Sequence, residues 1–252
     1  MTPLATLPMY DWPEMRAAQA AFWTAIRDGL RARGVMAPDD LTTGNIWREP
    51  GLVFSQTCGW PWATAYRDAL DLVATPVSDI PGCAGDSYSS MVVVRVEARF
   101  STLADLRGAS VAFNGEESQS GVHTLREAVA TLAQGAPFFG QGIPSGAHRD
   151  SIRAVARGRA DCAAIDAVCW AMAQEFEPQT TARLRVLHQT APAPALPFVT
   201  RRGGPVEAVR GALDEAIARG YGAPLFITDL ADPDPARYDA LITRVADAPP
   251  LF

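Results

Sequence analysis

Short apolar runs alternate with segments of helical spacing along most of this chain, and few folds accommodate that order. In the second half, for example, the apolar run 110–113 precedes Val122 and Leu125, which begin an apolar helix face. Such alternation predicts an α/β fold with mainly parallel sheets and flanking helices. The predicted strands are 5–10, 51–57, 69–77, 89–97, 110–113, 161–165 and 184–187, and the predicted helices are 12–33, 103–107, 122–132, 151–157, 167–176, 206–218 and 235–245.

Length and charge exclude several classes of protein. The chain has 252 residues, of which 48% are hydrophobic, so it can bury the core of two lobes or of one large domain. Its net charge is −6, which gives nucleic acid no general electrostatic reason to bind, and we expect none to be a partner. All 22 basic residues are arginine, which excludes a Schiff-base lysine and a phosphate-loop lysine.

Compartment and cysteine chemistry are only partly determined by the sequence. No stretch approaches the roughly 20 apolar residues of a membrane helix, so we expect no membrane insertion. The N-terminus lacks a secretory-signal pattern, which predicts a cytoplasmic protein if Met1 is native. The four cysteines lack metal-ligand spacing, so no metal is expected. Cys58 and Cys83 form either a disulfide, which would indicate an oxidising compartment, or two small buried thiols.

Two polar turns between a strand and a helix are candidates for ligand binding, because open α/β sheets bind ligands beyond the carboxyl ends of their strands. Ser118, Gln119, Ser120 and Gly121 lie at one turn, where a hydroxyl caps the helix or the free amides bind an anion. Asp166 lies at another. It is either the N-cap of the following helix or an acceptor for a donor on the ligand, and one carboxylate can do both.

Further polar and aromatic side chains fall at the other predicted turns. Singly, each is explained by packing, by a cap or by a turn. Together they have the composition expected of a ligand cleft. These residues are Tyr10, Gln56, Thr57, Tyr88 and His148.

Three segments carry a resemblance to a known family. They are SQTCGWPWA at 55–63, SQSGVHTL at 118–125 and GAHRDSIRAVARGRADCAAIDAVCWAM at 146–172. In these segments, and over residues 10–200 more broadly, the chain resembles the PhnD-like phosphate, phosphite and phosphonate substrate-binding proteins of ABC transporters. The resemblance implies a two-lobed type II periplasmic-binding-protein fold with two crossing strands as a hinge.

The resemblance also implies how the lobes and the site are organised. Lobe 1 would comprise 1–95 plus 188–252, and lobe 2 would comprise 96–187. Ser118, Ser120 and Gly121 would cradle an oxyanion, with Asp166 and His148 facing it. The remaining predicted contacts would close the site from lobe 1; they are Tyr10, Gln56, Thr57 and Tyr88.

The function that follows is capture of a small phosphonate-like or phosphate-like anion by hinge closure, for an ABC transporter. The resemblance implies a periplasmic monomer that uses no cofactor and has a transporter permease as a partner. Two alternatives remain open: a cytoplasmic small-molecule sensor of the same fold, and a cofactor-biosynthesis enzyme on this fold. We do not expect an enzyme, since Gly-x-Ser-x-Gly and His-Glu-x-x-His are both absent.

Overall fold

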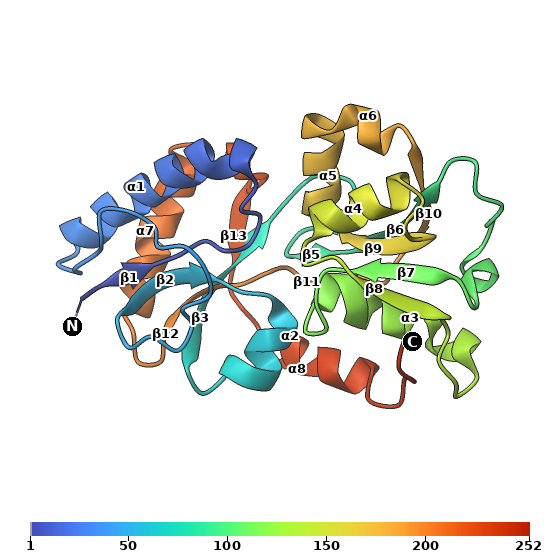
Figure 1. Ribbon diagram of the computed structural model, residues 1–252. Helices are drawn as coiled ribbons and strands as arrows, with labels where there is room; N and C mark the ends of the chain where they lie inside the picture. Colours follow the sequence, from blue (N-terminus) through green and yellow to red (C-terminus); the bar gives the residue numbers. More distant parts are fainter. Residues whose placement is uncertain (1) are drawn as a thin grey trace. The chain divides into compact units, whose positions relative to one another are not determined.

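The computed structural model describes residues 2–252 and divides them into two units. The first unit contains 2–79, 84–86 and 194–239, and the second contains 80–83, 87–193 and 240–252. Each has its own five-stranded sheet (Figure 1). Within residues 2–252, no helix has the length and apolar character needed to cross a membrane.

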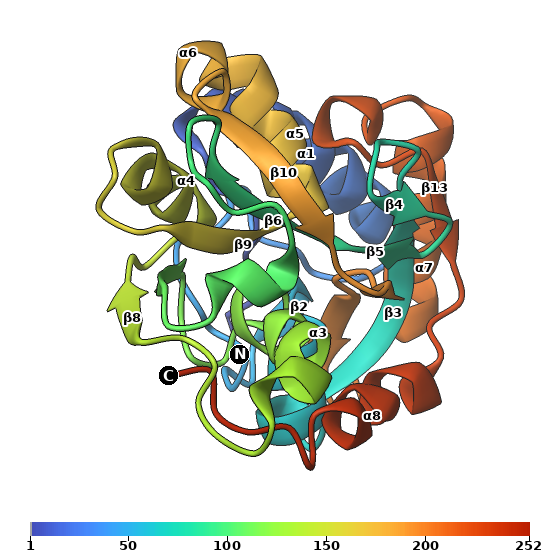
Figure 2. The same ribbon diagram turned by 90° about the vertical axis from the view of Figure 1, so that its right-hand side faces the viewer.

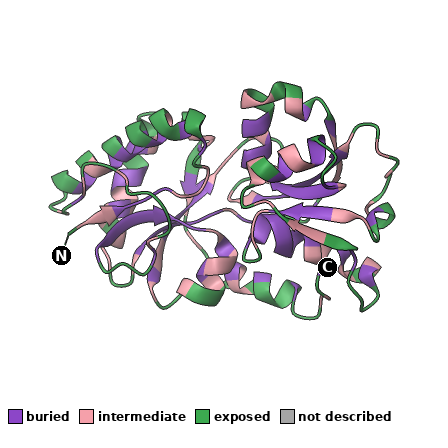
Figure 3. Cartoon of the chain, in the orientation of Figure 1, coloured by how far each residue is buried: buried purple, intermediate pink, exposed green. Residues whose placement is uncertain are grey.

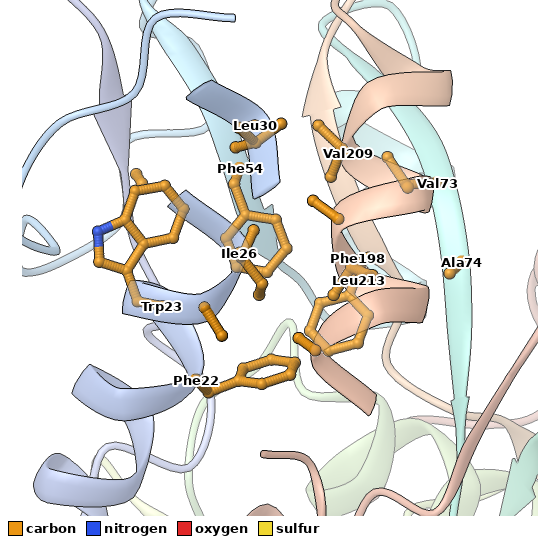
Figure 4. Close-up of a cluster of buried hydrophobic side chains, with 14 of the residues drawn as sticks. Phe22, Trp23, Ile26, Leu30, Phe54, Val73, Ala74, Phe198, Val209 and Leu213 are labelled. Carbon is orange, nitrogen blue, oxygen red and sulfur yellow. The ribbon is translucent and has the colours of Figure 1, made fainter. Parts of the chain in front are cut away.

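The sheet of the first unit packs against two neighbouring helices. Its strand order is β1-β2-β12-β3-β13. Phe22 from α1, Leu213 from α7 and Phe198 from β12 meet in the core over the sheet (Figure 4). Trp23 stacks on Phe54 with their ring centroids 5.7 Å apart. The elements are β1 (Leu4–Ala5), α1 (Arg16–Ala32), β2 (Leu52–Gln56), β3 (Leu70–Val77), β12 (Phe198–Arg201), α7 (Val206–Ala218) and β13 (Asp229–Ala231), with the short helices η1 (Pro13–Met15), α2 (Gly59–Pro61), η2 (Trp62–Tyr66) and η5 (Ala223–Leu225).

The start of α1 differs from a capped helix. Trp12 is the residue before the first helical turn, and its side chain makes no capping hydrogen bond. Asp11 instead accepts a hydrogen bond from Arg16 Nε at 3.0 Å. At the other end, Gly34 has φ +75°, the left-handed conformation that ends a helix at low cost only for glycine.

The sheet of the second unit is covered on both faces. Its order is β10-β6-β9-β7-β8, with α3 on one face and α4 and α5 on the other (Figures 1 and 2). Strand β9 is buried throughout, and exposed residues gather on outer helical surfaces and loops (Figure 3). The elements are β6 (Ser90–Arg95), η3 (Leu103–Leu106), β7 (Ser110–Phe113), η4 (Gln119–His123), α3 (Thr124–Ala133), β8 (Gln141–Pro144), α4 (His148–Ala156), β9 (Cys162–Asp166), α5 (Ala167–Phe176), α6 (Pro178–Thr181) and β10 (Leu184–Gln189).

Both sheets are mixed rather than mainly parallel. In the first unit, β12 pairs antiparallel with β2 and with β3, whereas β1 and β2 are parallel. In the second unit, β6 is antiparallel to β9 and to β10, whereas β7 is parallel to β8 and β9. The reason is that β6 and β12, the extended segments by which the chain passes from one unit into the sheet of the other, run opposite to the strands of the βα units. Three further short strands, β4 (Cys83–Ala84), β5 (Ser87–Tyr88) and β11 (Ala193–Pro194), pair with one another.

The boundaries between the two units differ from the predicted lobe boundaries at 95/96 and 187/188. Strand β6 belongs to the second unit, because it pairs along its length with β9. The C-terminal residues 240–252 also belong there. Leu251 lies in the apolar core of that unit, and Arg126 donates to the carbonyl of Pro249 at 3.2 Å. Helix α8 (Pro235–Arg244) therefore begins in one unit and ends in the other.

Candidate functional site

A buried carboxylate lies where β9 meets α5 in the second unit. Asp166 is the last residue of β9, and only 1% of it is exposed. Its Oδ1 accepts hydrogen bonds from the backbone N–H of Val168 at 2.8 Å and of Cys169 at 3.2 Å. Asp166 is therefore the N-cap of α5, as one of the two interpretations predicted. A carboxylate has more acceptor positions than two amides use.

The polar loop before α3 is folded tightly and is also buried. Ser118 Oγ accepts from the N–H of Gly121 at 3.0 Å, which makes Ser118 the cap of the π-helical turn η4. A Cβ atom at Gly121 would overlap Asn114 Oδ1, so a side chain at this position would have to displace Asn114. Gln119 is 1% exposed, and neither of its amide atoms has a hydrogen-bond partner among residues 2–252. Unpaired buried amide atoms are unusual and are typical of a site that a ligand or water completes.

A series of hydrogen bonds connects this loop to the strand beside Asp166. Ser120 Oγ lies 2.7 Å from Nε2 of His148, the first residue of α4. Thr124 Oγ1 is placed to donate to the carbonyl of Ser120 at 3.0 Å and to Ser90 Oγ at 3.2 Å. Ser90 on β6 is in register with Asp166 on β9. The structure thus brings Ser120, His148 and Asp166 together at one end of the sheet.

None of these groups is a cation at neutral pH. Burial lowers the pKa of His148 to about 4, so its ring is neutral. Cys83 lies near enough to Asp166 to sense its charge: burial first, and then that carboxylate, raise the pKa of the Cys83 thiol to about 12. An anion bound here would be held by backbone amides and hydroxyls, not by an ion pair.

The neutral state of His148 predicts a pH dependence of stability. In the unfolded chain this histidine takes up a proton near pH 6.5, and in the folded chain only near pH 4. The unfolded state therefore binds more protons between these values, so the free energy of unfolding should fall as the pH drops from 6.5 to 4. The expected loss is about 3 kcal/mol.

Urea denaturation at several pH values measures this effect. His148→Gln should reduce the difference between pH 7 and pH 4 by most of that amount. An unchanged pH dependence in His148→Gln would show that His148 is not the buried neutral group described here. His123, whose pKa burial also lowers to about 4, should contribute in the same direction and remain in the variant.

Two strand ends place the predicted residues of the first unit. Gln56 ends β2 and is 4% exposed, and its Nε2 donates to the carbonyl of Leu196 at 3.0 Å. Thr57 follows it and is fully buried. Tyr10 lies beyond β1 with φ +62°, an uncommon conformation for a bulky residue that is held only where the surroundings require it. Because β1 and β2 are parallel, these residues lie at one edge of the sheet.

Tyr88 is the predicted residue whose surroundings differ most from the prediction. It was assigned to lobe 1, but it lies in the second unit, on β5, and is 2% exposed. The helix predicted over 151–157 begins at His148. All four cysteines are free thiols, so Cys58 and Cys83 form no disulfide. Within residues 2–252, no three His, Cys, Asp or Glu side chains gather as metal ligands would.

Four residues near this cluster were not predicted, namely Ser90, Asn114, Thr124 and Cys83. Ser90 lies within the predicted apolar strand 89–97, and no role was assigned to it. Thr124 lies in the same loop motif as Ser120, four positions on, a spacing that places its hydroxyl over the Ser120 carbonyl. Such a spacing could have signalled it. The sequence holds no signal for the approach of Asn114 to Gly121, which depends on the folded path of the loop.

The fold is that of the type II periplasmic binding proteins. The chain belongs to one family in that class. Residues 54–220, more than half of its length, match the family described as "ABC transporter, phosphonate, periplasmic substrate-binding protein". The predicted family and fold class are thereby confirmed. Membership implies a small ligand and a transporter permease as partners, and the family is periplasmic.

Solved structures share this fold at low sequence identity. A Xanthomonas citri protein bound to chloride ion is 17% identical with a TM-score of 0.75, and the alignment covers 98% of this chain and 99% of that one. The binding protein component of an ABC phosphonate transporter from Pseudomonas aeruginosa is 14% identical, with a TM-score of 0.75 and coverages of 98% and 86%. PhnD1 from Prochlorococcus marinus, in complex with methylphosphonate, is 15% identical, with a TM-score of 0.72 and coverages of 98% and 99%. No curated protein matches the chain by sequence.

Proposed function

We propose that the chain captures a phosphonate-like or phosphate-like oxyanion at the polar cluster of its second unit. The observation that carries this proposal is the joining of Ser120, His148 and Asp166 by hydrogen bonds and strand register in one polar cluster. The backbone amides at the start of η4 would supply further donors to the anion. The family, and the methylphosphonate complex of a protein with the same fold, support this ligand class.

The buried carboxylate selects among anions. Asp166 repels a fully ionised ligand but accepts a hydrogen bond from one that carries a proton or an amine. Phosphonates and phosphate retain a titratable proton near neutral pH, whereas a sulfonate does not. The predicted ligand is therefore a protonated oxyanion or an aminoalkylphosphonate, and methanesulfonate should bind poorly.

We propose that binding proceeds by hinge closure, with no bond made or broken. A ligand shifts the population toward the closed state by its differential contacts, which Tyr10, Gln56, Thr57 and Tyr88 would supply together with the oxyanion cluster. The protein would act as a periplasmic monomer that delivers its ligand to an ABC-transporter permease. A chain without turnover fits the cluster, since within residues 2–252 no carboxylate is hydrogen-bonded to Nδ1 of His148, as a Ser-His-Asp triad needs.

A thermal-shift screen tests the ligand class. The panel contains phosphate, phosphite, methylphosphonate, 2-aminoethylphosphonate, methanesulfonate, acetate and amino acids. A ligand present at 100 times its dissociation constant adds about 2.7 kcal/mol of stability. We expect shifts from phosphorus oxyanions and none from methanesulfonate. Equal shifts from methanesulfonate and methylphosphonate would contradict the role given to Asp166, and turnover of a hit would contradict the absence of catalysis.

Ser120→Ala should weaken the binding of the best phosphorus ligand about tenfold. The substitution removes one hydroxyl donor to the anion and the hydrogen bond to His148, and a hydrogen bond to a charged group contributes about 1.5–3 kcal/mol. Isothermal titration calorimetry measures the change. Ser101→Ala, an exposed serine in the same unit, is the matched control. An affinity of Ser120→Ala equal to that of the unsubstituted protein would remove Ser120 from the site.

A further inference from the structure

A cavity of about 440 Å³ lies entirely within the first unit, and none of its lining residues is among those assigned to the oxyanion. Its walls are the segment after β1, one side of α1 and the loop 39–44. Such a volume is typical of small-molecule sites. Leu7, Ala20 and Leu41 give it an apolar lining, and Thr24 and Thr42 add hydroxyls.

Trp23 contributes a buried donor to the wall of this cavity. The residue is 1% exposed, and its Nε1–H has no acceptor among residues 2–252. One face of the indole stacks on Phe54, and the nitrogen lies on the side of the ring away from the core side chains (Figure 4). A buried donor that makes no hydrogen bond is costly. A ligand acceptor that reaches this N–H therefore gains the free energy of that hydrogen bond. The Nε1 atom is itself buried, so the groups that cover it must move for a ligand to reach it.

The charges at the mouth favour a cation. Three carboxylates and two guanidinium groups line the cavity. Arg16 is paired with Asp11, and Arg27 is paired with Asp28, which lies outside the lining. Asp39 is paired with Arg31, whereas Asp40 takes part in no ion pair among residues 2–252. Both lining arginines are already in ion pairs and attract an anion less, whereas the carboxylate of Asp40 can pair with an ammonium group.

We propose that this cavity is a second ligand site, which binds a small organic ammonium ion with an apolar body and a carbonyl acceptor. The ammonium group lies at Asp40, the apolar body contacts Leu7, Ala20 and Leu41, and the carbonyl accepts from Trp23 Nε1. The site does not depend on the oxyanion cluster, and occupancy of one does not require occupancy of the other.

Phenylalaninamide is a suitable probe, because it carries an ammonium group, an aromatic body and a carbonyl. Titrated into the whole protein and followed by calorimetry, it should bind, whereas the anion N-acetylphenylalanine should not. Asp40→Asn should weaken phenylalaninamide about threefold or more, since it removes an exposed charge partner. Trp23→Phe keeps the ring on Phe54 but removes the donor, and should weaken the probe about fivefold to tenfold. Asp68→Asn, the same charge change elsewhere in the first unit, should leave binding unchanged.

A spectroscopic readout serves if Trp23→Phe folds poorly. The chain has six tryptophans, and in a nitrogen-15 spectrum of the unsubstituted protein one buried indole N–H should shift on titration with phenylalaninamide, more than it does with N-acetylphenylalanine. Asp166→Asn should weaken methylphosphonate but not phenylalaninamide, so failure at one site is distinguishable from failure at the other. The proposal is overturned if no indole N–H moves at millimolar probe, or if Asp40→Asn and Trp23→Phe both bind the probe as the unsubstituted protein does.

Discussion

Asp166→Asn is expected to weaken methylphosphonate binding by about 10-fold to 100-fold while changing the free energy of unfolding little. Asparagine keeps a side-chain oxygen for the amides of Val168 and Cys169 and is as good an N-cap as aspartate. It loses the charge that accepts the ligand proton, and a hydrogen bond to a charged group contributes about 1.5–3 kcal/mol. Alanine is a poorer probe, because it would also remove the cap of α5.

Titration calorimetry with two ligands isolates the role of the charge. Methanesulfonate, which offers no proton, should gain affinity in Asp166→Asn because a repulsive charge has been removed. Glu175→Gln, an exposed charge change near the other end of α5, should alter neither ligand. If Asp166→Asn weakened the binding of both ligands equally, the carboxylate would not be accepting a hydrogen bond from the protonated ligand. The proposed selection of protonated oxyanions would then be wrong.

Much of the fold was predictable because local patterns dominate in this chain. The predicted helix 167–176 and the strand 110–113 coincide with α5 and β7. Both have strong signals: a polar residue before an apolar helical run, and a short apolar run bounded by turn formers. Strand direction was not predictable in the same way. An apolar run such as Val92–Val94 looks the same whichever way its neighbours run, so only tertiary pairing shows that β6 is antiparallel to β9.

The division into units could not be read from local pattern either. Leu251 and Phe252 follow a helix assigned to the first lobe, and their packing with the second unit depends on long-range contacts. Phe252 stacks on Phe113 with centroids 4.9 Å apart, and the carbonyl of Leu251 accepts from the N–H of Phe139 at 2.7 Å. A short C-terminal tail has no sequence pattern that indicates which unit it packs against. The boundary between the units therefore cannot be predicted there without the fold.

The candidate site was predictable to the extent that its residues lie at turns. Ser118 and Asp166 are caps, and caps are encoded locally. The hydrogen bond between Ser120 and His148 joins positions 28 residues apart, and the alignment of Ser90 with Asp166 depends on strand register. A sequence can nominate such residues one at a time, but only the sheet shows that they share one end.

Gly121→Ala should reduce the free energy of unfolding by about 2 kcal/mol and weaken methylphosphonate binding markedly. A Cβ atom there would overlap Asn114 Oδ1 and crowd Ser118 Oγ, so these side chains or the loop that carries them must shift, and overpacking of a buried site typically costs about 1–3 kcal/mol. The amides at the start of η4 would move with the loop, and the anion would lose their alignment. Urea denaturation and calorimetry measure the two effects separately.

Asn114→Ala supplies the control, because it removes the obstructing oxygen. Asn114 Oδ1 is buried with no hydrogen-bond partner among residues 2–252, so deleting it should cost little stability. In the double variant the added and removed atoms exchange space, and we expect a coupling energy of about 1–2 kcal/mol that restores most of the lost stability. Additive effects of the two substitutions would mean that Asn114 does not limit position 121. Restored stability without restored binding would instead show that the anion itself needs the space that a glycine leaves.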